Sequence, residues 1–126
     1  MAPVRVMLVD DSPQMLRSLQ SLLKRMPELT VVAVAPDGVE ALSLIQATEP
    51  QLMILDINMP KMNGLELLDE LRKMNSPVEV IVLSAYADAI LQQDAIARGA
   101  IAFVSKGNVA LFLKILQGVV GNLASI

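Results

Sequence analysis

Three acids, a hydroxyl and an amine each stand at or just past the end of a short apolar run. They are Asp10, Asp11, Asp56, Ser84 and Lys106. Oxygen ligands without histidine or cysteine favour a hard cation, above all Mg²⁺, which usually keeps several of its waters. A carboxylate beside such an ion and a lysine is equipped for phosphoryl transfer, where catalysis is mostly positioning and charge neutralisation. If the fold brings these groups together, they predict a magnesium site at which an aspartate becomes phosphorylated.

Several functions are excluded by what the sequence lacks. The chain has no cysteine and no histidine, so disulfides, thiolate metal sites and an internal phosphohistidine are excluded. It has neither GxxxxGK[ST] nor GxGxxG, so the phosphoryl group must arrive already activated on another molecule. A net charge of −3 without a basic cluster argues against nucleic-acid binding by this segment. No apolar run reaches the roughly 18 residues of a membrane span, and residues 1–5 lack the basic and then apolar layout of a signal peptide.

Five apolar segments alternate with stretches of helical periodicity. The expected strands are residues 4–9, 29–35, 52–55, 78–83 and 100–104, and the expected helices are about 13–26, 39–48, 65–74, 88–98 and 108–123. Such alternation with short connections predicts a parallel sheet with helices on both faces. We therefore expect residues 1–126 to form one flavodoxin-like (βα)5 domain, a doubly wound sheet with strand order 2-1-3-4-5. Ligands bind such sheets beyond the carboxyl ends of the strands, where the five polar residues stand.

This set of residues resembles the receiver domain of two-component response regulators. The run from Asp56 to Gly64, DINMPKMNG, is similar to that family's acceptor loop, and the likeness covers essentially the whole chain. The resemblance implies Mg²⁺-dependent transfer of a phosphoryl group to Asp56 from a sensor histidine kinase or a phosphotransfer protein. It also implies a cytoplasmic domain that is not an enzyme, beyond slow self-phosphorylation from small phosphodonors and self-dephosphorylation.

The resemblance also assigns the metal ligands. Asp11, Asp56 and the backbone carbonyl of Asn58 would hold Mg²⁺, and Asp10 would assist, partly through water. Without a cation, carboxylates this close would raise one another's pKa values.

The remaining roles implied by the resemblance concern the switch. Lys106 and Ser84 would each contact a phosphoryl oxygen, and Ser84 would draw its loop toward the site. The family's switch aromatic falls on Phe103, which would turn inward as Ser84 moves. Asn58 and Tyr86 stand at variable positions that tune dephosphorylation in the family.

Two residues depart from the family's pattern. Gly107 follows Lys106, where the family often has a proline in a cis peptide. A cis bond before a residue other than proline costs about 2.5–4 kcal/mol, so we expect a trans peptide and a looser loop carrying Lys106. Phe103 stands where tyrosine is frequent, and it has no hydroxyl to donate in either state of the switch.

The last helix has an apolar stripe and two aliphatic residues off that stripe. At about 100° per residue, the stripe expected to face the core consists of Val109, Phe112, Leu113, Leu116, Val119, Val120 and Leu123. Leu111 and Ile115 lie off it, and exposed aliphatics favour a partner surface, although single ones are common on any protein. We expect this helix, the fifth strand and the preceding helix to contact an output domain, a downstream protein or, on activation, a second copy.

Two other classes of function stay open. A haloacid-dehalogenase-like phosphatase with an aspartate nucleophile needs a second acid two residues further on, where this chain has Asn58. A receiver-like interaction module that works without phosphorylation would not need the full acidic set. Each residue also has a simpler structural explanation, with Asp11 or Ser12 as a helix cap, Asp56 as a turn acid and Lys106 as a surface lysine.

Overall fold

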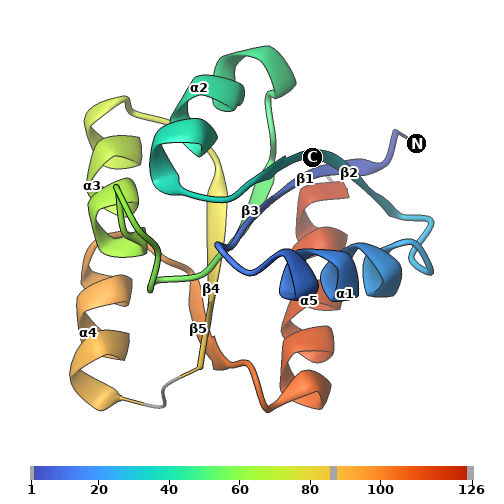
Figure 1. The fold of residues 1–126 in the computed structure, drawn as a ribbon. Coiled ribbons are helices and arrows are strands. Elements are labelled where there is room, and N and C mark those ends of the chain that lie inside the picture. Colours follow the sequence, from blue (N-terminus) through green and yellow to red (C-terminus); the bar gives the residue numbers. More distant parts are fainter. Residues whose placement is uncertain (1, 86–87, 125–126) are drawn as a thin grey trace.

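The computed structural model describes residues 2–85 and 88–124. Within these residues, five strands form one parallel sheet in the order β2-β1-β3-β4-β5, as the sequence predicts (Figure 1). The strands are Val4–Val9 (β1), Leu29–Ala35 (β2), Leu52–Leu55 (β3), Glu79–Ser84 (β4) and Ala102–Ser105 (β5). The helices are Pro13–Leu23 (α1), Gly38–Thr48 (α2), Gly64–Lys73 (α3), Ala89–Ala97 (α4) and Val109–Ala124 (α5).

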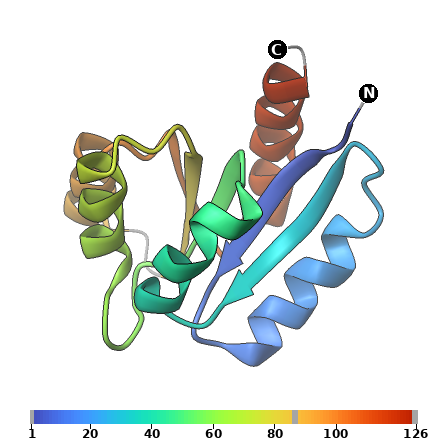
Figure 2. The same ribbon diagram turned by 90° about the horizontal axis from the view of Figure 1, so that it is seen from above.

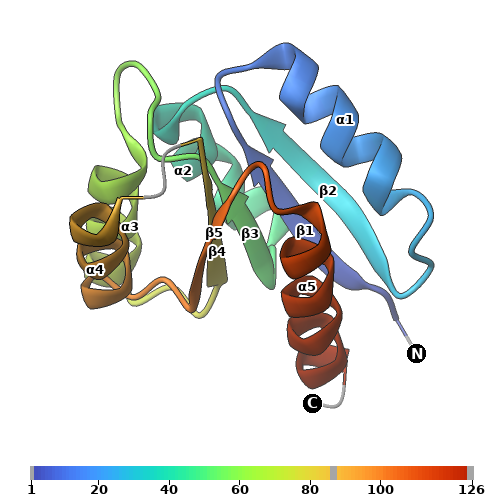
Figure 3. The ribbon, with the colours of Figure 1, turned by 90° about the horizontal axis from the view of Figure 1, so that it is seen from below.

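The helices cover the two faces of the sheet unequally. Helices α1 and α5 pack on one face, and α2, α3 and α4 on the other, as Figures 2 and 3 show from opposite sides. All residues of β3 are buried because both of its faces lie under helices. Met7 and Met53 are fully buried, where their flexible side chains fill the core.

Polar caps begin the helices at the carboxyl edge of the sheet. The side chains of Ser12, Asp37, Asn63 and Asp88 accept hydrogen bonds from the first turns of α1, α2, α3 and α4. In α3 the cap is reciprocal, since Glu66 accepts from the Asn63 backbone N–H at 3.1 Å. The cap of α1 is therefore Ser12, which leaves the Asp11 carboxylate available for the site.

Two segment ends differ from the sequence expectation by more than one residue. Helix α1 ends at Leu23, three residues early, because Arg25 and Met26 donate i−3 hydrogen bonds to Leu22 and Leu23 in a tighter last turn. Strand β5 begins at Ala102 rather than residue 100, because the Ala100 N–H bonds Ala95 at the end of α4.

The packing of α5 corrects part of the predicted stripe. Val109 is 51% exposed, because it is the first helical residue and lies almost one turn before the first buried one, Phe112. Ile115, which we expected to lie off the packed stripe, is half-buried and packs against the core that α1 and α5 share. Leu111 is 41% exposed, as predicted. No helix in the described part of the chain is long and apolar enough to cross a bilayer.

Candidate functional site

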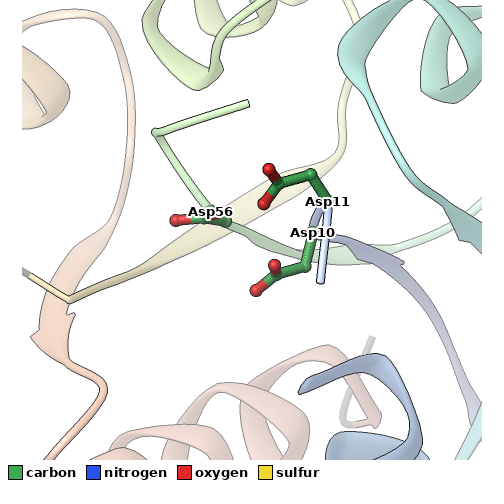
Figure 4. A group of neighbouring side chains, drawn as sticks. All are labelled: Asp10, Asp11 and Asp56. Atoms are coloured by element: carbon green, nitrogen blue, oxygen red, sulfur yellow. The ribbon is translucent and has the colours of Figure 1, made fainter. Parts of the chain in front are cut away.

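The acids predicted at the strand ends lie together at the carboxyl edge of the sheet. Asp10 and Asp11 follow β1, and Asp56 follows β3, which is the neighbour of β1. Among the described residues, these acids each offer a carboxylate oxygen within 4.8 Å of the others, and Figure 4 shows the carboxylates gathered over the strand ends. Asp10 and Asp56 are buried and Asp11 is exposed, so an ion entering the cluster would pass Asp11 from solvent.

Lys106, the residue after β5, reaches this acidic cluster. Its Nζ donates to Asp10 Oδ2 at 2.9 Å and lies 3.6 Å from Asp56 Oδ1. The backbone N–H of Lys106 donates to the Ser84 carbonyl at 2.8 Å, which ties the end of β5 to the end of β4. The ammonium therefore neutralises part of the charge of the cluster, and an excess of negative charge remains for a cation.

Burial makes the ionised form of Asp56 costly. The pKa of its carboxyl rises from 3.8 to about 6, chiefly because it is buried and then because Asp10 is charged. The Lys106 charge and a hydrogen bond from the Asn58 backbone lower the pKa only in part. Burial alone would lower the pKa of Lys106, but its hydrogen bond and charge interaction with Asp10 raise it above the ordinary value. Lys106 thus stays charged beside a carboxyl whose ionisation a divalent ion would favour.

Asn58 lies in the loop between β3 and α3, residues 56–63, which we call the acceptor loop. Its side chain is exposed, and its backbone donates to Asp56. The loop closes at Gly64, whose N–H bonds the Ile57 carbonyl at 2.9 Å. A Cβ at Gly64 would lie 2.7 Å from Ile57 Cα and 2.8 Å from the Asp56 carbonyl oxygen, so only glycine fits there. Glycine is common in turns for several reasons, so nothing in the sequence indicated this close approach of Gly64 to the Asp56 carbonyl.

The predicted switch residues lie on β4 and β5. Ser84 is fully buried at the end of β4, in register with Ser105 of β5. Phe103 is half-buried and packs on the sheet face that carries α4. Tyr86, predicted to tune dephosphorylation, lies outside the described residues. The switching roles of Ser84 and Phe103 stay predictions.

The peptide between Lys106 and Gly107 is trans, as expected, since residues 2–85 and 88–124 contain no cis peptide. Ser105 Oγ accepts from the Gly107 N–H at 3.2 Å, and the Asn108 side chain accepts from the Leu111 N–H at 3.2 Å. How loosely this loop holds Lys106 stays a prediction.

The acidic cluster and Lys106 lie at the switch point of a 2-1-3-4-5 sheet, and this combination of fold and site is typical of one class of protein. The sequence matches the response regulator receiver domain family over residues 6–115, so the chain belongs to this family of two-component signalling domains. It is thus a receiver domain, the class that the acceptor-loop pattern predicts.

Relatives of known name agree with this assignment. The chain is 38% identical over 82 residues to the nitrate/nitrite response regulator protein NarL of Escherichia coli K12, covering 65% of this chain and 38% of NarL. It is 40% identical over 107 residues to a protein-glutamate methylesterase/protein-glutamine glutaminase of Pyrococcus horikoshii, covering 82% of this chain and 28% of that protein. The chain therefore spans only about a third of these relatives, and their output activities belong to them.

Solved structures share the whole architecture. The response regulator domain of Thermotoga maritima CheB superposes with a TM-score of 0.85 at 28% identity, covering 99% of this chain and 98% of that one. CheY in a CheX-CheY-BeF3-Mg complex from Borrelia burgdorferi gives a TM-score of 0.85 at 28% identity, covering 93% and 89%.

Proposed function

We propose that residues 1–126 act as one receiver domain in which Asp56 accepts a phosphoryl group from a phosphohistidine. The observation that carries the proposal is the gathering of three carboxylates within 4.8 Å, with the Lys106 ammonium 3.6 Å from Asp56. The donor would be a sensor histidine kinase or a phosphotransfer protein, because this chain has no histidine of its own. Such donors act in the cytoplasm, which is where we place this domain.

The donor set fits Mg²⁺. Its side-chain ligands are carboxylate oxygens, which suit a small hard ion. Asp11, Asp56 and the Asn58 carbonyl would bind it directly. Both oxygens of Asp10 already accept hydrogen bonds, from the Ser12 N–H and from Lys106, each at 2.9 Å, which favours contact with the ion through water. The bound ion would supply positive charge to balance the phosphoryl oxygens.

Transfer itself requires little of the protein beyond placement. An Asp56 oxygen bonds to phosphorus while the phosphorus–nitrogen bond of the phosphohistidine breaks and the imidazole leaves. The phosphorylated side chain carries roughly −1.5 to −2 units of charge, by analogy with other phosphorylated side chains, in place of the single negative charge of the carboxylate. Lys106 then turns from Asp10 toward a phosphoryl oxygen, and Ser84 donates to another. Water later removes the phosphate from Asp56, which returns the domain to its starting state.

We further propose that phosphorylation alters the face formed by α4, β5 and α5. Each of these elements or its flank carries exposed aliphatic side chains: Ile90 and Ile96 on α4, Ile101 before β5, and Val109 and Leu111 at the start of α5. The partner is an output domain, a downstream protein or a second copy, reached through Ser84 and Phe103. Coupling of this kind is typically worth about 1–3 kcal/mol.

Labelling with radioactive acetyl phosphate and Mg²⁺ tests the phosphoacceptor. We expect Asp56→Asn to abolish the label, because the amide is not a nucleophile for phosphorus. Asp94→Asn is the matched control, since Asp94 is an exposed residue of α4, and it should be labelled like the wild type. Label on another residue of Asp56→Asn would refute the assignment, and sustained hydrolysis of phosphoesters by the wild type would favour a phosphatase.

A further inference from the structure

The acceptor loop is attached to the turn between β2 and α2. The Gly38 N–H donates to the Met62 carbonyl at 3.3 Å, and Lys61 Nζ lies 3.7 Å from Asp37 Oδ2. Figure 3 shows the loop running beside the start of α2. These contacts join segments more than 20 residues apart in sequence.

At this attachment, the backbone of Gly38 lies so close to Met62 that a side chain at position 38 would not fit. A Cβ at Gly38 would lie 2.8 Å from Met62 Cγ and 2.9 Å from the Met62 carbonyl oxygen, so any larger residue must displace the loop. Gly38 is the first residue of α2, and Met62 is half-buried against the core. The loop backbone therefore rests directly on the backbone of a helix start.

Asp37 holds the turn and the loop with different oxygens. Its Oδ1 accepts from the Glu40 N–H at 2.9 Å and caps α2, while its Oδ2 faces Lys61. The Asp37 carboxylate is buried, although the Lys61 side chain is 71% exposed. Lys61 has a φ of 65°, a conformation that a residue with a side chain keeps only when its surroundings fix it.

The segment that leads into this turn also contacts the backbone of Asp10, a member of the acidic cluster. The Asp10 N–H donates to the Ala35 carbonyl at 3.1 Å, at the end of β2. The segment from Ala35 to Gly38 thus contacts the backbone of Asp10 on one side and the acceptor loop on the other. The Asn58 backbone, which bonds Asp56, lies between Ile57, whose carbonyl accepts the Gly64 N–H that closes the loop, and the attached residues Lys61 and Met62.

We infer that Asp37 and Gly38 are positioning residues that hold the acceptor loop in the conformation that presents Asp56 and the Asn58 carbonyl for phosphoryl transfer. The effect on transfer rests on the proposed phosphorylation of Asp56, whereas the effect on the loop does not. A loop displaced from Gly38 would misplace Asn58 while leaving every acid in place. Misplacement by about 1 Å is enough to lower a rate by orders of magnitude.

The test compares glycine substitutions with different surroundings. Gly38→Ala must push Met62 away, whereas at Gly118, on the exposed side of α5, a Cβ meets nothing within 4 Å among the described residues. We expect Gly38→Ala to slow labelling by acetyl phosphate about tenfold or more, to raise the Mg²⁺ concentration for half-maximal rate, and to shift the Asn58 amide resonance. Gly118→Ala should match the wild type in all three.

A second variant covers the case in which Gly38→Ala does not fold. Asp37→Asn keeps an equally good cap for α2 but removes the charge that faces Lys61. We expect it to shift the Asn58 resonance and to slow labelling at least twofold, and Lys61→Met to do the same, whereas Lys61→Arg should behave as the wild type. A general loss of stability would not follow this pattern, because Asp37→Asn retains the cap.

The outcomes separate this inference from the proposed function. If the wild type is not labelled at Asp56, the proposed function fails, and the Asn58 resonance alone decides whether the turn positions the loop. If Asp56 is labelled, and the folded Gly38 and Asp37 variants keep the wild-type rate, Mg²⁺ requirement and Asn58 resonance, the positioning role is overturned.

Discussion

At the scale of single residues, Asp56 is subject to opposing demands. It must be ionised to attack phosphorus, yet burial and the Asp10 charge raise its pKa to about 6. Lys106 offsets this in part, but its shorter contact is with Asp10 at 2.9 Å. The folded protein therefore keeps an acid at a position where its charge is costly until a cation arrives.

The cost of ionising the buried Asp56 carboxyl makes the free energy of unfolding depend on pH in a direction that can be measured. Because the pKa of Asp56 is higher in the folded protein than its ordinary 3.8, the folded state binds more protons, and stability falls as pH rises from about 4 to about 6. Without Mg²⁺ near pH 7.5, we expect Asp56→Asn to raise the free energy of unfolding by about 1–3 kcal/mol. Urea denaturation between pH 4 and pH 7.5 measures the difference, which should shrink toward pH 4. A constant difference across that range would contradict this explanation.

At the scale of elements, loops at the carboxyl edge hold both the caps of the helices and the acids of the site. Ser12 caps α1 next to Asp11, and Asn63 caps α3 at the end of the acceptor loop. Capping therefore does not compete with the site, since separate side chains serve each purpose. On α5 the helix packs through a stripe that reaches Ile115, while Leu111 stays exposed.

Because Ile115 is half-buried and Leu111 is exposed, a charge at each position should change the free energy of unfolding by a different amount. We expect Ile115→Asp to lower the free energy of unfolding by about 1–3 kcal/mol, because it puts a charge against the core. Leu111→Asp should change it by no more than about 0.5 kcal/mol. Urea denaturation of both variants measures this. Leu111→Asp is then the proper probe of the proposed output face by gel filtration, and equal losses of stability would refute the packing of α5.

At the scale of the whole molecule, the strand order brings Asp10 and Asp56 together. Strands β1 and β3 are neighbours although α1, β2 and α2 separate them in sequence. Their connecting helices leave to opposite faces of the sheet, which opens a crevice at the switch point. The acidic cluster therefore exists only in the folded chain, and an ion bound there stabilises the fold.

Metal binding should consequently raise stability in a pH-dependent way. At about 100 times its dissociation constant, Mg²⁺ should add about 2.7 kcal/mol to the free energy of unfolding. The gain should diminish below about pH 6, where the Asp56 carboxyl takes up a proton that competes with the ion. Thermal denaturation with MgCl₂ and with NaCl of equal ionic strength measures the effect. Asp11→Asn should remove most of it, and an undiminished gain in that variant would exclude Asp11 as a ligand.

Much of the fold and of the site follows from the sequence. Alternating apolar segments and helical periods predicted the 2-1-3-4-5 sheet, because these patterns record which residues lie on a buried strand or a buried helix face. The polar residues that follow β1, β3 and β5 predicted the gathering of Asp10, Asp11, Asp56 and Lys106, because parallel strands end at one edge.

Other features were decided only by the tertiary structure. The contact of Gly38 with Met62, the pairing of Lys106 with Asp10 rather than chiefly with Asp56, and the burial of Ile115 left no local pattern in the chain. Each depends on how distant loops and helices settle against one another, at distances of a few ångström that periodicity does not encode. The sequence thus determined which groups meet, and packing determined how closely they meet and what charge they carry.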